Sequence, residues 1–214
     1  MTEDVDIPSH ALYYDFNHAV ERILKREPSE ITRMTSIPYD EKKSCFTVIS
    51  LAQSITVTYP DCKVTFTETG KIPILNWRMP ILHHLATADG VPPGGNLVPF
   101  RHIDKPIAHP INFENDTEVK LLKYFDNKPA DKLRQACEAL GGEVLKGNAD
   151  LFVRFDFLPK FAIYLKFWYS GDDPPGSVKF LFDDRCIHYL EQMDVQVCGP
   201  ILADFIVKQY ELTN

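Results

Sequence analysis

The sequence predicts an α+β protein, a single domain in which antiparallel β-sheets carry helices packed on one face. Three observations lead to this class: a meander of short Thr- and Val-rich segments, three alternating strands over residues 150–182, and helical periodicity around them. Strands and helices do not alternate one by one, which argues against a βαβ protein. The 214 residues suit one domain over residues 1–214, with a subdivision into 1–112 and 113–214 as the alternative.

The first part of the chain begins with a helix and continues as a meander. Apolar residues recur at three- and four-residue steps over residues 10–25, the spacing of a helix with one buried stripe, and Pro28 marks its end. The segments 44–50, 54–59 and 63–68 are rich in Thr and Val and are separated by turn residues. This pattern is typical of antiparallel strands.

A helix and a long connection follow the meander. Residues 75–90 return to helical spacing, and Pro80 inside them predicts that the helix begins or is kinked there. Residues 91–112 are rich in Pro and Gly and are expected to form neither helix nor strand. A loop of this length inside a compact domain is more often functional than incidental.

The second part contains two helices, three strands and a closing helix. Helices are predicted over residues 115–125 and 128–142 from their capping residues and apolar spacing. The strands are predicted at residues 150–157, 161–169 and 177–182. The closing helix lies within residues 194–212, and its regular part is expected to begin at Pro200, because proline is unfavourable inside a helix.

Composition excludes several classes of protein. A net charge of −7 and a pI near 5.5 argue against a nucleic-acid partner, whose phosphates need clustered Lys and Arg. No apolar stretch reaches the roughly 18 residues of a membrane span, and the start of the chain does not resemble a signal peptide. The five cysteines form no C-x-x-C pair, so no iron–sulfur cluster is expected in this chain and a cytoplasmic location with reduced thiols is predicted.

Several short motifs occur in an order that resembles a known family. They lie within the stretches 147–184 and 188–207, and the upstream stretch 80–103 is similar as well. The motifs are Asp150, Leu158-Pro159, Phe167-Trp168, Asp172-Asp173-Pro174, Leu181-Phe182-Asp183, Tyr189-Leu190 and, upstream, Phe100-Arg101. In this order the chain resembles domain of unknown function 3786, a family found mainly in anaerobic bacteria and archaea.

The resemblance implies a role but no reaction. Relatives in that family are joined to cysteine-rich iron–sulfur modules or are encoded among genes of corrinoid-linked methyl transfer. It therefore implies an accessory or cofactor-linked protein of anaerobic metabolism. Since this chain lacks the cysteine cluster, any cluster would belong to a partner.

Four residues are candidates for ligand binding: Arg101, His102, Trp168 and Asp183. Arg101 can clamp an anionic group with its planar guanidinium, or it forms a salt bridge. Trp168 is a core-edge residue or a ligand platform. Asp183, at a strand end, caps the following turn or takes part in the site. We expect Arg101 to lie beside the strand ends that carry Trp168 and Asp183.

Other polar residues are weaker candidates. The acidic turn around Asp172 and Asp173 is explained mainly by turn formation. No H-x-x-x-H or H-E-x-x-H pattern is present, so no structural zinc is predicted, with His84 and His109 as weak metal candidates. A single histidine could still serve as the axial ligand of a tetrapyrrole.

Two functions follow from these observations. The first is a non-catalytic binding or accessory protein that holds an anionic small molecule or a cofactor such as a corrinoid, or docks an iron–sulfur or corrinoid partner. The second is an enzyme whose site gathers Arg101, His102 and Asp183. The sequence has no paired motif of nucleophile and base, which favours binding.

Overall fold

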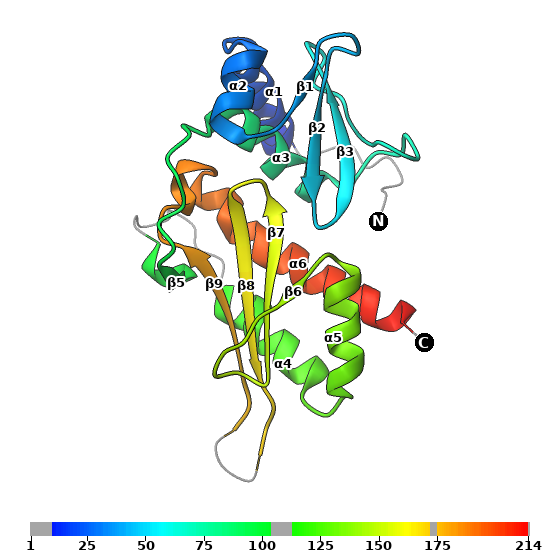
Figure 1. Cartoon of the computed structure of the whole chain (residues 1–214), viewed down its shortest axis with the longest axis vertical. Helices are drawn as coiled ribbons and strands as arrows, with labels where there is room; N and C mark the ends of the chain where they lie inside the picture. Colours follow the sequence, from blue (N-terminus) through cyan, green and yellow to red (C-terminus); the bar gives the residue numbers. More distant parts are fainter. Residues whose placement is uncertain (1–9, 104–112, 172–174, 214) are drawn as a thin grey trace.

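The computed structural model describes residues 10–103, 113–171 and 175–213. Its elements form two groups, one above the other in Figure 1. Each group contains one antiparallel sheet and three α-helices. The predicted α+β class is confirmed. No helix in the described part of the chain combines the length and the apolarity needed to cross a membrane.

The first group contains a four-stranded sheet in the order β1-β2-β3-β4. Its strands are β1 (Tyr39–Asp40), β2 (Cys45–Ser50), β3 (Gln53–Thr58) and β4 (Val64–Phe66). Its helices are α1 (His10–Leu24), α2 (Pro28–Thr35) and α3 (Leu75–Thr87). Inward residues Phe46, Val48, Ile55 and Val57 are buried, which is the alternation expected of a sheet with one covered face. The predicted meander is confirmed.

Helix α2 was not predicted. The sequence interpretation used Pro28 only as the end of the first helix, whereas Pro28 is the first residue of the next one. Proline is well suited to that position, because the first N–H groups of a helix have no partner within it. Ile31 and Thr35 bury one face of this short helix.

The second group contains a five-stranded antiparallel sheet in the order β5-β9-β8-β7-β6. Its strands are β5 (Leu97–Pro99), β6 (Glu143–Val144), β7 (Leu151–Leu158), β8 (Phe161–Trp168) and β9 (Ser177–Asp183). Its helices are α4 (Lys120–Phe125), α5 (Ala130–Ala139) and α6 (Gln192–Leu212); in Figure 1, α4 and α6 pass behind the strands and α5 lies beside them. The three predicted strands are confirmed to within a residue at their ends.

The predicted start of α6 at Pro200 is wrong. The helix begins at Gln192 and continues through Gly199 and Pro200. Apolar burial on both sides of the proline offsets the lost hydrogen bond, since Cys198 and Leu202 are fully buried. Gly199 also makes room for a neighbour, because a Cβ there would lie 2.5 Å from the ring of Phe113.

Two details differ from the sequence prediction. Helix α3 begins at Leu75 and contains Pro80, so of the two alternatives for this proline, a helix start is wrong and a kink stays a prediction. The long connection is also not free of strands, because β5 pairs with β9 and a 3-10 turn, Phe100–His102, follows it. Residues 104–112 lie outside the described part. Since β5 belongs to the second sheet, the two groups do not divide at residue 112.

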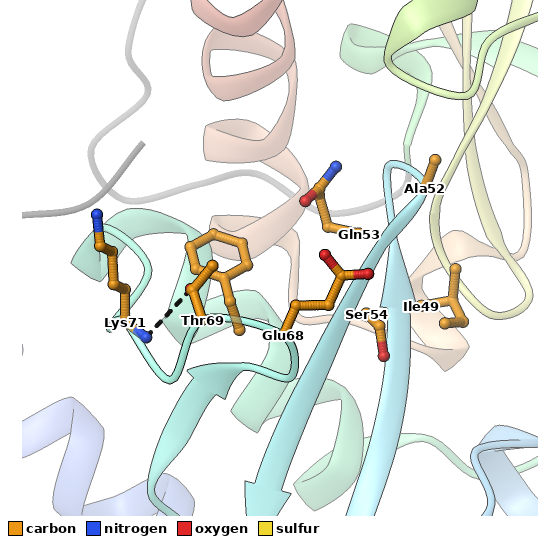
Figure 2. Close-up of a pocket in the computed structure, with 8 residues that line it drawn as sticks. Ile49, Ala52, Gln53, Ser54, Glu68, Thr69 and Lys71 are labelled. Carbon is orange, nitrogen blue, oxygen red and sulfur yellow. Dashed lines mark hydrogen bonds between the residues drawn. The ribbon is translucent and has the colours of Figure 1, made fainter.

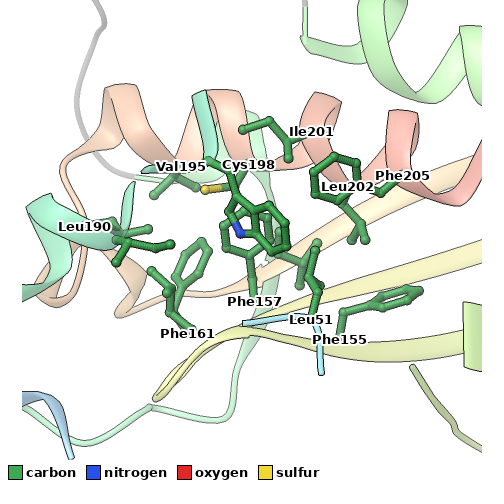
Figure 3. Close-up of a cluster of buried hydrophobic side chains, with 14 of the residues drawn as sticks. Leu51, Phe155, Phe157, Phe161, Leu190, Val195, Cys198, Ile201, Leu202 and Phe205 are labelled. Carbon is green, nitrogen blue, oxygen red and sulfur yellow. The ribbon is translucent and has the colours of Figure 1, made fainter. Parts of the chain in front are cut away.

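The tip of the β2–β3 hairpin joins the two groups. Leu51 donates its backbone N–H to the Asp156 carbonyl at 3.1 Å, and the Ser50 hydroxyl donates to the Phe157 carbonyl at 2.5 Å. The indole N–H of Trp77 donates to the Ser50 hydroxyl at 2.8 Å. Figure 3 shows Leu51 among side chains of β7 and α6. The apolar core is therefore continuous across the two groups.

Candidate functional site: a histidine junction at the end of α3

Arg101 and His102 lie together in the turn after β5, at the surface. The guanidinium of Arg101 pairs with the Glu114 carboxylate at 2.8 Å, and its side chain is 61% exposed. Its Nε also lies 3.4 Å from His102 Nε2. Arg101 thus forms the salt bridge that the sequence interpretation weighed against anion binding.

Asp183 is buried, and its carboxylate binds backbone. Oδ1 accepts the N–H groups of Gly94 and Arg185, both at 2.9 Å, and Oδ2 accepts that of Gly95 at 2.7 Å. The bond from Arg185 corresponds to the predicted capping of the turn after the strand. The bonds from the two glycines were not predicted. They fasten the start of the long connection to the end of β9.

Trp168 lies at the other end of the sheet from Asp183. Trp168 is paired with Ser177 at the start of β9, whereas Asp183 ends that strand and is paired with Leu97. The indole N–H of Trp168 donates to the Asn148 carbonyl at 2.7 Å. The structure therefore does not bring the four candidate residues into one site. Ligand binding by Arg101 remains a prediction.

Two other candidate groups lie outside the part of the chain that the structure describes. His109 and the aspartates Asp172 and Asp173 fall outside the described residues. Among the residues that are described, no group of three His, Cys, Asp or Glu side chains is arranged to hold a metal ion. All five cysteines are buried free thiols.

A set of histidines gathers instead where the end of α3 meets the chain before α6. The segment before α6 includes a 3-10 turn, Cys186–His188. We call this region the histidine junction; it comprises His83, His84, Asp89, His188, Tyr189 and Asp194. Each of its three histidines has its Nδ1 atom within hydrogen-bonding distance of an oxygen from the opposite segment.

His83 forms a buried pair with Asp194. Nδ1 of His83 lies 2.6 Å from Oδ1 of Asp194, and both side chains are less than one tenth exposed. Asp194 stands in the first turn of α6, where the positive end of the helix dipole favours a carboxylate. The pair thereby fixes α3 against the start of α6.

His84 is fully buried and is neutral at physiological pH. Its Nδ1 lies 3.2 Å from the Tyr189 carbonyl, an acceptor, so this nitrogen carries the proton. Burial lowers the pKa of His84 to about 4, since the charged imidazolium would lose its hydration. Its Nε2 has no hydrogen-bond partner in the described structure, but it is buried and out of reach of a bulky ligand.

His188 forms the exposed counterpart of these contacts. Its Nδ1 lies 2.7 Å from Asp89 Oδ2, while the other Asp89 oxygen accepts the Val91 N–H at 3.0 Å. The Asp89 N–H also donates to the His188 carbonyl at 3.2 Å. The Tyr189 hydroxyl donates to the Val91 carbonyl. Asp89 is therefore held at both oxygens, and it holds the imidazole in turn.

The charge of Asp89 is maintained by these bonds. Partial burial acts to raise the pKa of its carboxyl, but the hydrogen bonds from His188 and Val91 outweigh this effect, and the pKa is lowered. In the neutral form of His188, an ionised Asp89 keeps the ring proton on Nδ1. The Nε2 atom then presents a lone pair, and no described residue binds it. The His188 side chain is 38% exposed.

Sequence reasoning missed the junction because its partners are far apart in the chain. His188 was not among the histidines considered, and Asp89 is 99 residues away from it. The one usable signal was its neighbour, since Tyr189 belongs to a motif of the resemblance.

The fold and the junction define an α+β protein with two antiparallel sheets and an oriented, partly exposed histidine where the end of α3 meets the chain before α6. Residues 27–204 match the family described as Domain of unknown function (DUF3786), and the chain belongs to this family. No curated protein and no solved structure matches the chain.

Proposed function

We propose that the protein is a non-catalytic binding or accessory protein of anaerobic metabolism that supplies an imidazole ligand to the metal of a cofactor. The cofactor class is a corrinoid or another tetrapyrrole, and the ligating atom is Nε2 of His188. The observation that carries the proposal is the His188–Asp89 pair at 2.7 Å, with Nε2 left for a ligand.

The chemistry of this pair suits metal ligation. Metal-binding histidines commonly donate their second ring N–H to a carboxylate, which fixes the tautomer and makes the ligating nitrogen more basic. Asp89 supplies that carboxylate, and Val91 fixes the carboxylate in turn. A tetrapyrrole needs only one such protein ligand, because its own ring nitrogens fill the other positions in the plane.

The exposure of His188 bears on how the cofactor arrives. An imidazole at the bottom of a deep cavity could bind only a small free metal ion. A half-exposed imidazole such as that of His188 can bind the metal of a flat cofactor from one face. We therefore expect the cofactor to come free in solution or on a corrinoid or iron–sulfur partner protein.

The alternative of an enzyme built on Arg101, His102 and Asp183 is less well supported. Both oxygens of Asp183 already accept backbone N–H groups, which makes it a poor proton acceptor. Arg101 is neutralised by Glu114.

The proposal is tested by optical titration under anaerobic conditions with cobinamide, a corrinoid that has no axial base of its own. We expect a shift of the corrin absorption bands with saturation at one cobinamide per chain. His188→Ala should abolish the shift. Asp89→Asn should weaken binding by about 10–100-fold, the usual cost of losing such an outer carboxylate.

His18 provides the matched control, since it is an exposed histidine on α1. His18→Ala should bind cobinamide as the wild type does. The proposal is wrong if the wild type causes no spectral shift, or if His188→Ala gives the same shift as His18→Ala.

A further inference from the structure

A pocket of about 410 Å³ lies at the opposite end of α3 from the histidine junction. The β2–β3 hairpin forms one wall, with Ile49, Gln53 and Ser54, and the turn after β4 forms the other, with Glu68 and Lys71 (Figure 2). Phe66, the last residue of β4, also lines the pocket. The turn precedes α3 and the junction follows it, so the helix separates the two places by about 20 Å.

The walls of the pocket are held by backbone hydrogen bonds. In the turn, Gly70 N–H donates to the Phe66 carbonyl at 2.8 Å, and Phe66 N–H donates to the Lys71 carbonyl at 2.9 Å. Thr67 N–H donates to the Ser54 carbonyl at 2.9 Å, which joins the turn to the hairpin. A pocket with walls fixed in this way needs little rearrangement to accept a ligand.

The floor of the pocket is anchored in the core. The ring of Phe66 packs edge-on against Trp77, with ring centres 5.6 Å apart. Trp77 is fully buried and is bonded to Ser50 in the hairpin. Phe66 and Ile49, which is 50% exposed, offer an apolar surface beside the polar groups.

The charged groups at the pocket carry opposite signs and are not paired with each other. Neither the Glu68 carboxylate nor the Lys71 ammonium makes a hydrogen bond or ion pair with another described residue. The Gln53 amide is likewise unengaged among these residues. The hydroxyl of Ser54, by contrast, is already bonded to Thr67 at 2.9 Å.

We propose that this pocket binds a small zwitterion with an apolar side chain, of the amino-acid or dipeptide class. Glu68 pairs with the ammonium group of the ligand and Lys71 with its carboxylate. Phe66 and Ile49 contact the side chain, and Gln53 supplies a donor and an acceptor. A ligand with a single charge would satisfy only one of the two free groups.

The test is isothermal titration calorimetry with leucine and leucyl-leucine, using isoamylamine and isocaproate as matched probes. Isoamylamine lacks the carboxylate of leucine, and isocaproate lacks its ammonium. We expect binding of at least one zwitterion, and weaker binding of both matched probes. Glu68→Gln and Lys71→Met should each weaken zwitterion binding by roughly tenfold or more, the effect of losing one charged hydrogen bond.

Lys63 provides the control, because it is exposed and lies outside the pocket. Lys63→Met should bind the zwitterion as the wild type does. The inference is overturned if neither zwitterion binds, or if both single-charge probes bind as tightly as the zwitterion. It is also overturned if Glu68→Gln and Lys71→Met bind the zwitterion as Lys63→Met does. These outcomes leave the cobinamide titration unaffected, because His188 lies at the other end of α3.

Discussion

The two halves of α3 make different kinds of contact with the rest of the protein. Before Pro80, the fully buried Trp77 packs against Phe205 of α6 with ring centres 4.9 Å apart. After Pro80, His83 and His84 meet oxygens from α6 and the chain before it. Apolar side chains are buried along the whole helix, but only the part after Pro80 adds buried histidine contacts; we call this part the polar end and the other the apolar end.

The two ends of α3 therefore contribute differently, one mainly to the stability of the fold and the other mainly to the positions of polar groups. Apolar burial is favourable with little dependence on direction, so the first half of α3 contributes mainly to the free energy of folding. Buried hydrogen bonds contribute less net energy but fix positions, and stability depends on pH where a buried group titrates, as His84 does. The polar end is therefore where we expect function, and the apolar end is where substitutions should destabilise most.

The largest effect is expected for Trp77→Ala. The substitution removes a fully buried indole and leaves the Ser50 hydroxyl without its donor. We expect a loss of about 3–5 kcal/mol in the free energy of unfolding, measured by urea denaturation. The control is Ile49→Ala, at a half-exposed position, for which the loss should be far smaller. Equal losses would contradict the comparison.

The next effect concerns pH and the polar end. The pKa of His84 is about 4 in the folded protein and 6.5 in a model peptide, so the unfolded state binds more protons between these values. Stability should therefore fall as pH decreases from about 6.5 to 4, by about 3 kcal/mol from this residue. His84→Phe should lose that part of the pH dependence. An unchanged pH profile in the variant would refute this assignment.

A smaller effect is expected for Asp183→Asn. Asparagine has one carboxamide oxygen in place of two carboxylate oxygens, so it cannot keep all three bonds to Gly94, Gly95 and Arg185. We expect a loss of about 1–3 kcal/mol. Hydrogen exchange should accelerate at the Gly94 and Gly95 amides. If these two amides keep their protection, Asp183 does not fasten the connection.

The smallest effect should be stabilising. Ala52 has a φ of 60° at the tip of the β2–β3 hairpin, a conformation that favours glycine. Ala52→Gly should raise the free energy of unfolding by about 0.5–1 kcal/mol, visible as a higher thermal midpoint. Ala162→Gly, within β8, should lower it. A loss in both variants would show that the hairpin tip stores no such strain.

The regular elements could largely be predicted from sequence because their signals are local. The alternation in β7 and the apolar spacing of α5 depend on neighbours in the chain, and both were found. Helix α6 was cut short at Pro200 because the compensation comes from burial, which the local sequence does not report. Tertiary packing overrode a local preference there.

The histidine junction could not be predicted from the sequence as the regular elements could. His83 and Asp194 are 111 residues apart, so no motif spacing could join them. The residues that were chosen, such as Arg101 and Trp168, stood out by type and by their place in motifs. Residue type alone did not reveal that Trp168 and Asp183 lie at opposite ends of the antiparallel pair β8–β9.

The most direct test of the proposed role is the electron paramagnetic resonance spectrum of cob(II)inamide bound to the protein. Since this corrinoid carries no axial base, any nitrogen splitting of the cobalt lines must come from a protein ligand. With ordinary histidine we predict that each resolved line splits into three, and with histidine labelled by the heavy nitrogen isotope into two. The splitting should disappear in His188→Ala. Unsplit lines in the wild type, or a splitting that survives in His188→Ala, would contradict the account.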